Sequence, residues 1–241
     1  MNSPGALRGR SALVTGASRG IGRAVAGALA SAGARVFLLA RSAGTLEQLA
    51  AELGDGAVAV PCDVTDATAL GRAMTAVLTA ADGAVDILVN NAGVFPLAPV
   101  AETSPASFEQ TLQANLAAPF RVLHAVLPGM RARQRGHVVT IGSVADRRIF
   151  GGNGAYSASK FGARALHEVL REECAGTGVR TSLVSPAATD TPIWDPVDPD
   201  NTPGFPPRAS MLRAEDVADA VLWAVTRPAH VNVDELRISR A

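Results

Sequence analysis

The sequence has few of the residues and segments that disulfide-bonded, metal-binding, nucleic-acid-binding and membrane proteins need. It holds only two cysteines, Cys62 and Cys174, which lie in apolar segments far apart in the chain. We therefore expect core thiols and neither a disulfide nor a metal site. Lysine plus arginine (22) equals aspartate plus glutamate (22), and no basic run occurs, so nucleic acid is not an expected partner. No run of 18 apolar residues is present, so no transmembrane helix or membrane association is expected.

The N-terminal stretch from Met1 to Arg10 holds no apolar segment of signal-peptide length. The sequence thus predicts a soluble, cytoplasmic protein. Hydrophobic residues make up 48% of the 241 residues and charged residues 18%, so the chain can bury a large core.

Short apolar runs alternate with helical segments along the whole chain. We expect strands over residues 11–15, 35–39, 57–60, 86–89, 137–141, 179–184 and 235–238. We expect helices over residues 20–32, 45–53, 66–81, 104–133, 154–174 and 214–226, with kinks or breaks at Pro119 and Pro128. This alternation predicts one α/β domain over residues 1–241, with a mainly parallel sheet and helices on both faces.

A glycine-rich loop lies between the first expected strand and the first helix. It reads Thr15-Gly16-Ala17-Ser18-Arg19-Gly20-Ile21-Gly22. Glycines there permit a tight turn and let the backbone approach a pyrophosphate at the helix N-terminus. The spacing differs from the usual Gly-x-Gly-x-x-Gly, but its place after a first strand favours dinucleotide binding over a plain turn.

The residues at the end of the second expected strand indicate whether NAD(H) or NADP(H) is the preferred cofactor. An acidic residue there would hold the ribose 2′-hydroxyl of NAD, but the chain has Arg41-Ser42. Arg41 would attract a 2′-phosphate, and Arg19 of the glycine loop points to the same anion. We therefore expect NADP(H) to be preferred, with NAD(H) possible. Asp63, after the third strand, either accepts a hydrogen bond from the adenine or helps cap the next helix, for which Asp66 is the better candidate.

The segment Tyr156-Ser157-Ala158-Ser159-Lys160 carries the chemistry. Residues four apart lie on one face of a helix, so the Tyr156 and Lys160 side chains should be neighbours. A cation beside a phenol favours the ionised phenol, and the pair is typical of a general acid/base acting on an alcohol. Ser143 lies upstream on the same expected sheet edge. No Gly-x-Ser-x-Gly motif of hydrolases occurs.

Together these motifs resemble the short-chain dehydrogenase/reductase family over nearly the whole chain. The matching residues are Thr15, Gly16, Gly20, Ile21, Gly22, Asp63, Asn91, Ala92, Gly93, Asn115, Ser143, Tyr156 and Lys160. The resemblance implies a Rossmann-like, doubly wound seven-stranded sheet, a nicotinamide cofactor, carbonyl or alcohol chemistry, and a homotetramer or homodimer.

The resemblance also implies roles for single residues. Tyr156 would exchange a proton with the substrate oxygen. Lys160 would favour the ionised form of Tyr156 and bind the nicotinamide ribose. Ser143 would hold the carbonyl. Asn115 would hold a water that links Lys160 to solvent. The expected cofactor-binding residues are Gly16, Ser18, Arg19, Gly20, Ile21, Gly22, Arg41, Ser42, Asp63, Val64, Asn91, Ala92, Gly93, Tyr156, Lys160, Pro186, Thr189 and Thr191.

One position departs from the family pattern. The family usually has Pro-Gly after the sixth strand, whereas this chain has Pro186-Ala187, so the loop beside the nicotinamide is expected to lie differently. The chain also lacks the Gly-rich C-terminus of bacterial 3-oxoacyl-[acyl-carrier-protein] reductases. That activity remains the alternative to a general carbonyl reductase. A non-catalytic NADP-binding regulator is a further alternative, which the intact catalytic residues disfavour.

A proline-rich segment over about residues 186–211 is expected to be a lid over the substrate, since long loops in compact domains are often functional. The expected substrate pocket comprises residues 94–97, residues 144–150, and Ile193, Trp194 and Phe205 of the lid. This lining is mostly apolar, with Asp146, Arg147 and Arg148 as candidate polar contacts for a small carbonyl or alcohol substrate.

Overall fold

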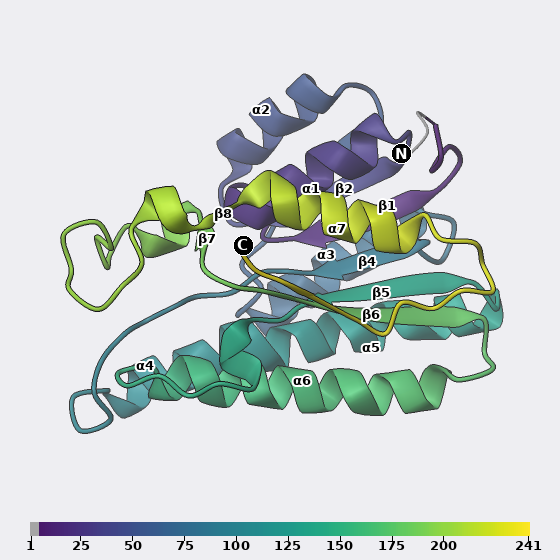
Figure 1. The fold of residues 1–241 in the computed structure, drawn as a ribbon. Coiled ribbons are helices and arrows are strands. Elements are labelled where there is room, and N and C mark those ends of the chain that lie inside the picture. The colour runs from purple at the N-terminus through teal and green to yellow at the C-terminus, as the bar shows by residue number, and fades with distance from the viewer. Residues whose placement is uncertain (1–4) are drawn as a thin grey trace.

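The computed structural model describes residues 5–241 and contains a seven-stranded, wholly parallel sheet in the order β3-β2-β1-β4-β5-β6-β9 (Figure 1). Its strands are β1 (Ser11–Thr15), β2 (Arg35–Ala40), β3 (Ala57–Pro61), β4 (Ile87–Asn90), β5 (Gly136–Ile141), β6 (Val179–Pro186) and β9 (Glu235–Ile238). The order reverses direction at β1, as in a doubly wound sheet. The expected fold class is confirmed.

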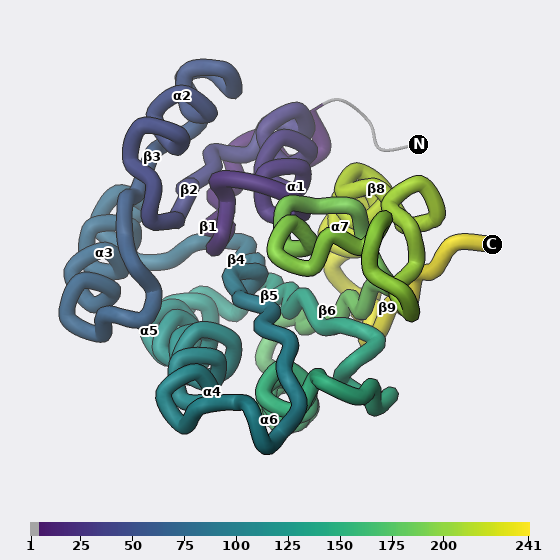
Figure 2. Tube along the Cα trace, turned by 90° about the vertical axis from the view of Figure 1, so that its left-hand side faces the viewer, coloured from purple at the N-terminus to yellow at the C-terminus, as the bar shows by residue number. Residues whose placement is uncertain are grey.

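Helices cover both faces of the sheet (Figures 1 and 2). They are α1 (Gly20–Ser31), α2 (Ala43–Leu53), α3 (Ala67–Ala80), α4 (Pro105–Leu112), α5 (Ala118–Ala132), α6 (Gly154–Cys174) and α7 (Ala214–Val225). Alternate strand residues enter different cores, because successive side chains point to opposite faces. In β1, Ala12 and Val14 pack with α1, α2 and α7, whereas Leu13 packs with α3, α5 and α6.

The helical region after β4 differs from the expectation at its prolines. Pro119 lies in the first turn of α5 and Pro128 lies inside it, and neither ends the helix. The irregularity is instead a π-helical turn, Gln113–Ala117, between α4 and α5. Because α4, the π-helical turn and α5 follow one another without a break, Pro119 lies within a continuous helical run, in which its ring nitrogen donates no hydrogen bond. The π-helical turn is the element that carries Asn115.

The local capping and thiol predictions are confirmed. Ser104 caps α4 by accepting a hydrogen bond from the Ser107 amide, and Asp66 caps α3 through the amides of Thr68 and Ala69. Cys62 and Cys174 are free and buried, and burial raises the pKa of each thiol.

The segment between β6 and α7 projects beyond the carboxyl edge of the sheet (Figure 1). It comprises the short strand β7 (Thr189–Asp190), the helical turns η3 (Pro192–Trp194) and η4 (Arg208–Ser210), and the strand β8 (Leu212–Arg213), which pairs with β7. Within residues 5–241 we find no helix whose length and apolar character would let it cross a bilayer.

Candidate active site

One large cavity of about 1050 Å³ opens at the carboxyl edge of the sheet, the edge that faces the viewer in Figure 2. Loops that follow β1, β2, β3, β4, β5 and β6 line it, together with the N-terminal part of α6. Ligands bind to open α/β sheets at this edge. The cavity therefore lies where the sequence motifs placed the site.

The glycine loop after β1 is held against the loop after β4. The Asn91 side-chain amide donates to the Thr15 backbone carbonyl (2.9 Å). The Thr15 hydroxyl accepts from the backbone N–H groups of Asn91 and Ala92 (2.9 and 3.0 Å). Gly16 has φ of +68°, and a Cβ there would meet Asn91 Nδ2 at 2.8 Å. A Cβ on Gly22 would collide with the Gly16 carbonyl oxygen. These two glycines are thus required by close packing.

The same loop leads into the N-terminus of α1, whose N-cap residue, Arg19, makes no side-chain capping hydrogen bond. The free N–H groups of the first turn can therefore bind an anion, which the positive end of the helix also favours. Ser18, Gly20 and Ile21 line the cavity at this point. The geometry fits the pyrophosphate of a dinucleotide.

Cationic groups flank this half of the cavity. Arg19 and Arg41 both line it and are exposed, and no acidic residue follows β2. Ser42 also lines it, with its hydroxyl 2.8 Å from that of Thr45. The two guanidinium groups are consistent with binding of an additional phosphate.

The structure separates the two roles considered for Asp63. Asp66 caps α3, whereas the Asp63 carboxylate accepts hydrogen bonds from the Thr65 amide (2.9 Å) and hydroxyl (2.7 Å). These hydrogen bonds, first that of the amide, lower the pKa of Asp63. Asp63 and Val64 line the cavity, so the adenine contact of Asp63 stays a prediction.

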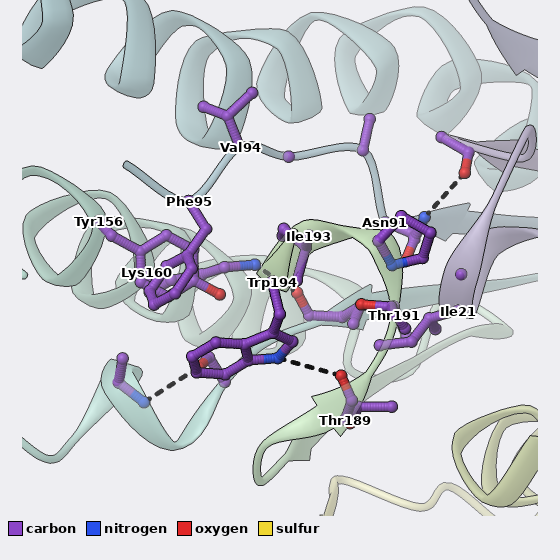
Figure 3. A pocket seen from close by; sticks show the side chains of 18 of the residues that line it. Ile21, Asn91, Val94, Phe95, Tyr156, Lys160, Thr189, Thr191, Ile193 and Trp194 are labelled. Carbon is purple, nitrogen blue, oxygen red and sulfur yellow. Dashed lines mark hydrogen bonds between the residues drawn. The ribbon is translucent and has the colours of Figure 1, made fainter. Parts of the chain in front are cut away.

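Tyr156 and Lys160 lie on the cavity-facing side of α6, as their spacing predicts (Figure 3). Lys160 is buried, its Nζ lies 5.6 Å from the Tyr156 ring centroid, and it donates to the Ile141 carbonyl (2.9 Å). Ser143 follows β5 and lines the cavity, its hydroxyl accepting from the Ala145 amide (3.1 Å). The structure thus brings three of the four expected catalytic residues to one cavity wall.

Asn115 lies behind that wall, buried in the π-helical turn. Its Oδ1 accepts from the Val94 amide (2.8 Å), and its Nδ2 donates to the Val94 carbonyl and to the Ser159 hydroxyl (both 3.0 Å). The Ser159 hydroxyl donates to the Tyr156 carbonyl (2.6 Å). Asn115 therefore ties the loop after β4 to the helix that carries Tyr156. Its expected contact with a water stays a prediction.

Asp146 and Arg147 do not contact the cavity, contrary to expectation. Asp146 is fully buried, pairs with the Arg147 guanidinium (2.7 Å), and accepts from the Ser185 hydroxyl (2.7 Å) and the Ser143 amide (3.2 Å). Arg147 also pairs with Glu235 of β9. The hydrogen bond to Asp146 raises the Arg147 pKa. The network thus fixes the backbone of Ser143 and leaves no charge for a substrate.

Phe95, Tyr156 and Trp194 lie together on the substrate side (Figure 3), and Phe205 extends this row of aromatic rings to four. Phe95 meets Tyr156 edge to face at 4.7 Å and Trp194 at 5.1 Å, and Trp194 meets Phe205 at 5.9 Å. The Trp194 indole N–H donates to the Thr189 carbonyl (3.1 Å). The lid therefore contacts Tyr156 through Phe95, as the predicted pocket lining implies.

The loop after β6 shows why alanine is tolerated at position 187. Ala187 is not among the described residues with positive φ, and its amide donates to the Ile238 carbonyl (2.9 Å). The backbone there does not need glycine, and Pro186, Thr189 and Thr191 all line the cavity. Because the backbone at position 187 has a conformation that alanine can adopt, the replacement of glycine by alanine gives no reason for this loop to be displaced.

Asn153 was missed by sequence reasoning. It lines the cavity from the N-cap position of α6, is 5% exposed, and its covered Oδ1 has no hydrogen-bond partner in the described chain. Asn153 lies about one helical turn before Tyr156, and this spacing could have indicated that the two side chains face the same cavity.

Comparison with known proteins gives concordant matches. The short chain dehydrogenase family model matches residues 10–202. Glycine betaine reductase ATRR of Emericella nidulans is 41% identical over 239 residues, which cover 97% of this chain but 19% of that protein. An uncharacterized oxidoreductase, SH0585, of Staphylococcus haemolyticus is 35% identical, covering 96% of this chain and 97% of its own. A metagenomic short-chain oxidoreductase crystallised in complex with NADP superposes with a TM-score of 0.84 at 35% identity, covering 98% and 99% of the two chains.

Proposed function

The chain belongs to the short-chain dehydrogenase/reductase family of oxidoreductases, and we propose that it transfers a hydride reversibly between NADP(H) and a carbonyl or secondary alcohol. The observation that carries the proposal is the convergence of Tyr156, Lys160 and Ser143 on one wall of the cavity. A protein that only sensed the cofactor would have no need of an acid/base pair there.

The bound nicotinamide cofactor would supply or accept the hydride. The glycine loop and the N-terminus of α1 would hold its pyrophosphate, and Asp63 and Val64 its adenine. The loops after β4 and β6 would hold the nicotinamide part through Asn91, Ala92, Gly93, Pro186, Thr189 and Thr191. This assignment is supported by the place of all these residues on the cavity wall.

We propose a preference for NADP(H) over NAD(H) because Arg19 and Arg41, with Ser42 beside them, surround the expected position of the 2′-phosphate. The NADP complex of the metagenomic relative agrees with this proposal.

During reduction, Tyr156 would donate its proton to the carbonyl oxygen, while Ser143 would hold that oxygen. Lys160 would orient the phenol and bind the nicotinamide ribose, and Asn115 would hold a water that returns the proton from solvent. Preorganisation of these groups supports such a role: Asp146 fixes the Ser143 backbone, and the Asn115–Ser159 contact fixes α6.

The proposed unit is a single domain over residues 1–241 that assembles as a homotetramer or homodimer in the cytoplasm. Exposed apolar side chains on α5 and α6, Phe120, Phe161 and Val169, support assembly. Two free thiols are compatible with a reducing compartment.

A steady-state assay of NADPH oxidation with a panel of ketones tests the proposed activity. Acetoacetyl-coenzyme A belongs in the panel, because a strong preference for that thioester would point to 3-oxoacyl-[acyl-carrier-protein] reduction instead. NADPH binding without oxidation by any carbonyl compound would point to a regulator.

A further inference from the structure

The charged side chains that line the cavity are confined almost entirely to the cofactor half. Among residues 5–241, they are Arg19, Arg41, Asp63 and Lys160. The first three belong to the loops after β1, β2 and β3, where the dinucleotide is proposed to bind. The fourth donates to the Ile141 carbonyl and lies against the Tyr156 ring. The substrate half therefore offers no charged partner that is not already part of the catalytic pair.

Three arginines lie close to the substrate half without lining it, and each is engaged elsewhere. Arg147 belongs to the buried network with Asp146. Arg148 stacks over the Phe150 ring at 5.2 Å. Arg208 pairs with two lid aspartates, each at 2.7 Å. Arg147 and Arg208 are therefore paired with carboxylates of the chain itself, and Arg148 is exposed and does not line the cavity.

The walls of the substrate half are apolar. They comprise Val94, Phe95, Leu97, Val144, Ile149, Phe150, Ile193, Trp194 and Phe205. The polar edge of Trp194 is removed from this surface, because its indole N–H is bonded to the Thr189 carbonyl (Figure 3). The hydroxyls of Ser143 and Tyr156 can receive one carbonyl oxygen, and the uncharged side chain of Asn153 also lines the cavity near Tyr156.

A carboxylate that entered such a space would lose its hydration and gain no partner, which is costly. An apolar ring or branched chain would instead bury its surface against aromatic side chains at a gain, and the same aromatic faces can attract a cation. Resting on the proposed function, we propose that the substrate is a largely apolar ketone without a negative charge, reduced to its secondary alcohol, with its body against the Phe95–Trp194 wall. The ketone takes a hydride from NADPH at carbon and a proton from Tyr156 at oxygen, leaving NADP⁺.

Three ketones of similar size and different charge test this proposal. 4-Acetylbenzamide is neutral, 4-acetylbenzoate is an anion, and (4-acetylphenyl)trimethylammonium is a cation. Each is assayed by NADPH oxidation with the full-length protein. We expect kcat/KM for the amide to exceed that for the anion by at least about 100-fold, since the carboxylate would be desolvated without a partner. The cation should stay within about tenfold of the amide, since the aromatic faces attract a quaternary ammonium group.

A variant of the cavity wall gives the second arm. Ile149 lines the cavity but is 72% exposed, so Ile149→Arg should fold normally. We expect this variant to raise the ratio of kcat/KM for 4-acetylbenzoate to that for the amide about fivefold, a modest change because an exposed ion pair is weak. The matched neutral change Ile149→Gln should not raise this ratio.

The outcomes separate the two proposals. Equal or better turnover of the anionic ketone by the wild-type protein would overturn the inference on substrate class and leave the oxidoreductase function standing. Bound NADPH that no ketone of the series oxidises would instead count against the proposed function itself.

Discussion

We expect the choice between NADP(H) and NAD(H) to depend on two exposed arginines at the cavity, Arg19 and Arg41. Arg41→Asp replaces attraction for a 2′-phosphate by repulsion. We expect the affinity for NADPH to fall by roughly 10- to 100-fold, the range for a charge-assisted hydrogen bond, and that for NADH to change little. Fluorescence titration with both cofactors measures this. Arg23→Asp is the control, because Arg23 pairs with Glu52 outside the cavity. A wild-type preference for NADH would contradict the assignment.

Two buried histidines should make stability depend on pH. His137 contacts the Ser182 hydroxyl (2.8 Å) and His167 the Thr140 hydroxyl (2.9 Å), while the other ring nitrogen of each is buried without a hydrogen-bond partner in the described chain. Burial lowers the pKa of His137 to about 3 and that of His167 to about 4. Between these values and 6.5, the unfolded chain binds more protons than the folded one, so stability falls as the pH falls.

The expected loss at pH 5 is on the order of 2 kcal/mol for each of these histidines. Urea unfolding at pH 7.5 and pH 5 measures it. His167→Gln should reduce the pH dependence, whereas His230→Gln, at an exposed position, should not. Equal dependence in wild-type protein and His167→Gln would show that His167 does not titrate on unfolding.

The residues that sequence reasoning located correctly depend on local spacing. Tyr156 and Lys160 are four apart on one helix, and the glycine loop joins a strand to the next helix, so their geometry follows from short segments. Asp146 and Arg147 were placed wrongly because their partners, Ser185 and Glu235, are distant in sequence. Spacing alone did not reveal that a charged pair next to Ser143 would be neutralised inside the fold.

At the scale of elements, the segment between β6 and α7 has the features of a lid. Trp194 contacts both Phe95 and Phe205. Arg208, near the C-terminal end of the lid, pairs with Asp190 and Asp195, which lie in its N-terminal part. These contacts are few, so the lid should open more readily than the sheet. We expect cofactor and substrate together to slow proteolysis within it by about threefold or more.

Trp194 can report this closure directly. The chain has two tryptophans, and the second, Trp223, lies on α7 with 43% exposure. Trp223→Phe leaves Trp194 alone, and its emission should change when NADPH and a ketone bind, after correction for cofactor absorbance. Trp194→Phe is the control. An unchanged Trp194 signal with unchanged proteolysis would identify the segment as a static connection.

The elements themselves were predictable where their boundaries have local signals. The strands of alternating βα units and the cap at Asp66 were expected and found. The π-helical turn at Asn115 was not expected, because Asn115 is held there by hydrogen bonds to Val94 and Ser159, which belong to other elements.

For the whole molecule, the account predicts self-association through α5 and α6. Phe120 is 52%, Phe161 40% and Val169 55% exposed, whereas the neighbouring Leu170 is buried in the monomer. Light scattering should give two or four times the chain mass of 24.7 kDa. Val169→Glu should shift the protein towards monomer, because a charge is costly in an apolar interface.

The control for assembly is Ala51→Glu, at an exposed position of α2 on the other face of the sheet. It should leave the mass unchanged. A monomer of about 25 kDa at micromolar concentration, with the wild-type sequence, would rule out the proposed assembly.

The central claim is that Tyr156 moves the proton, and one substitution tests it most directly. Tyr156 is the only tyrosine of the chain, so Tyr156→Phe removes every phenol while keeping the ring that contacts Phe95. Turnover is measured as NADPH oxidation by 4-acetylbenzamide, and NADPH affinity by fluorescence titration of the same samples. We predict a loss of kcat of at least about 100-fold with unchanged NADPH affinity. Turnover near that of the wild-type protein would contradict the account.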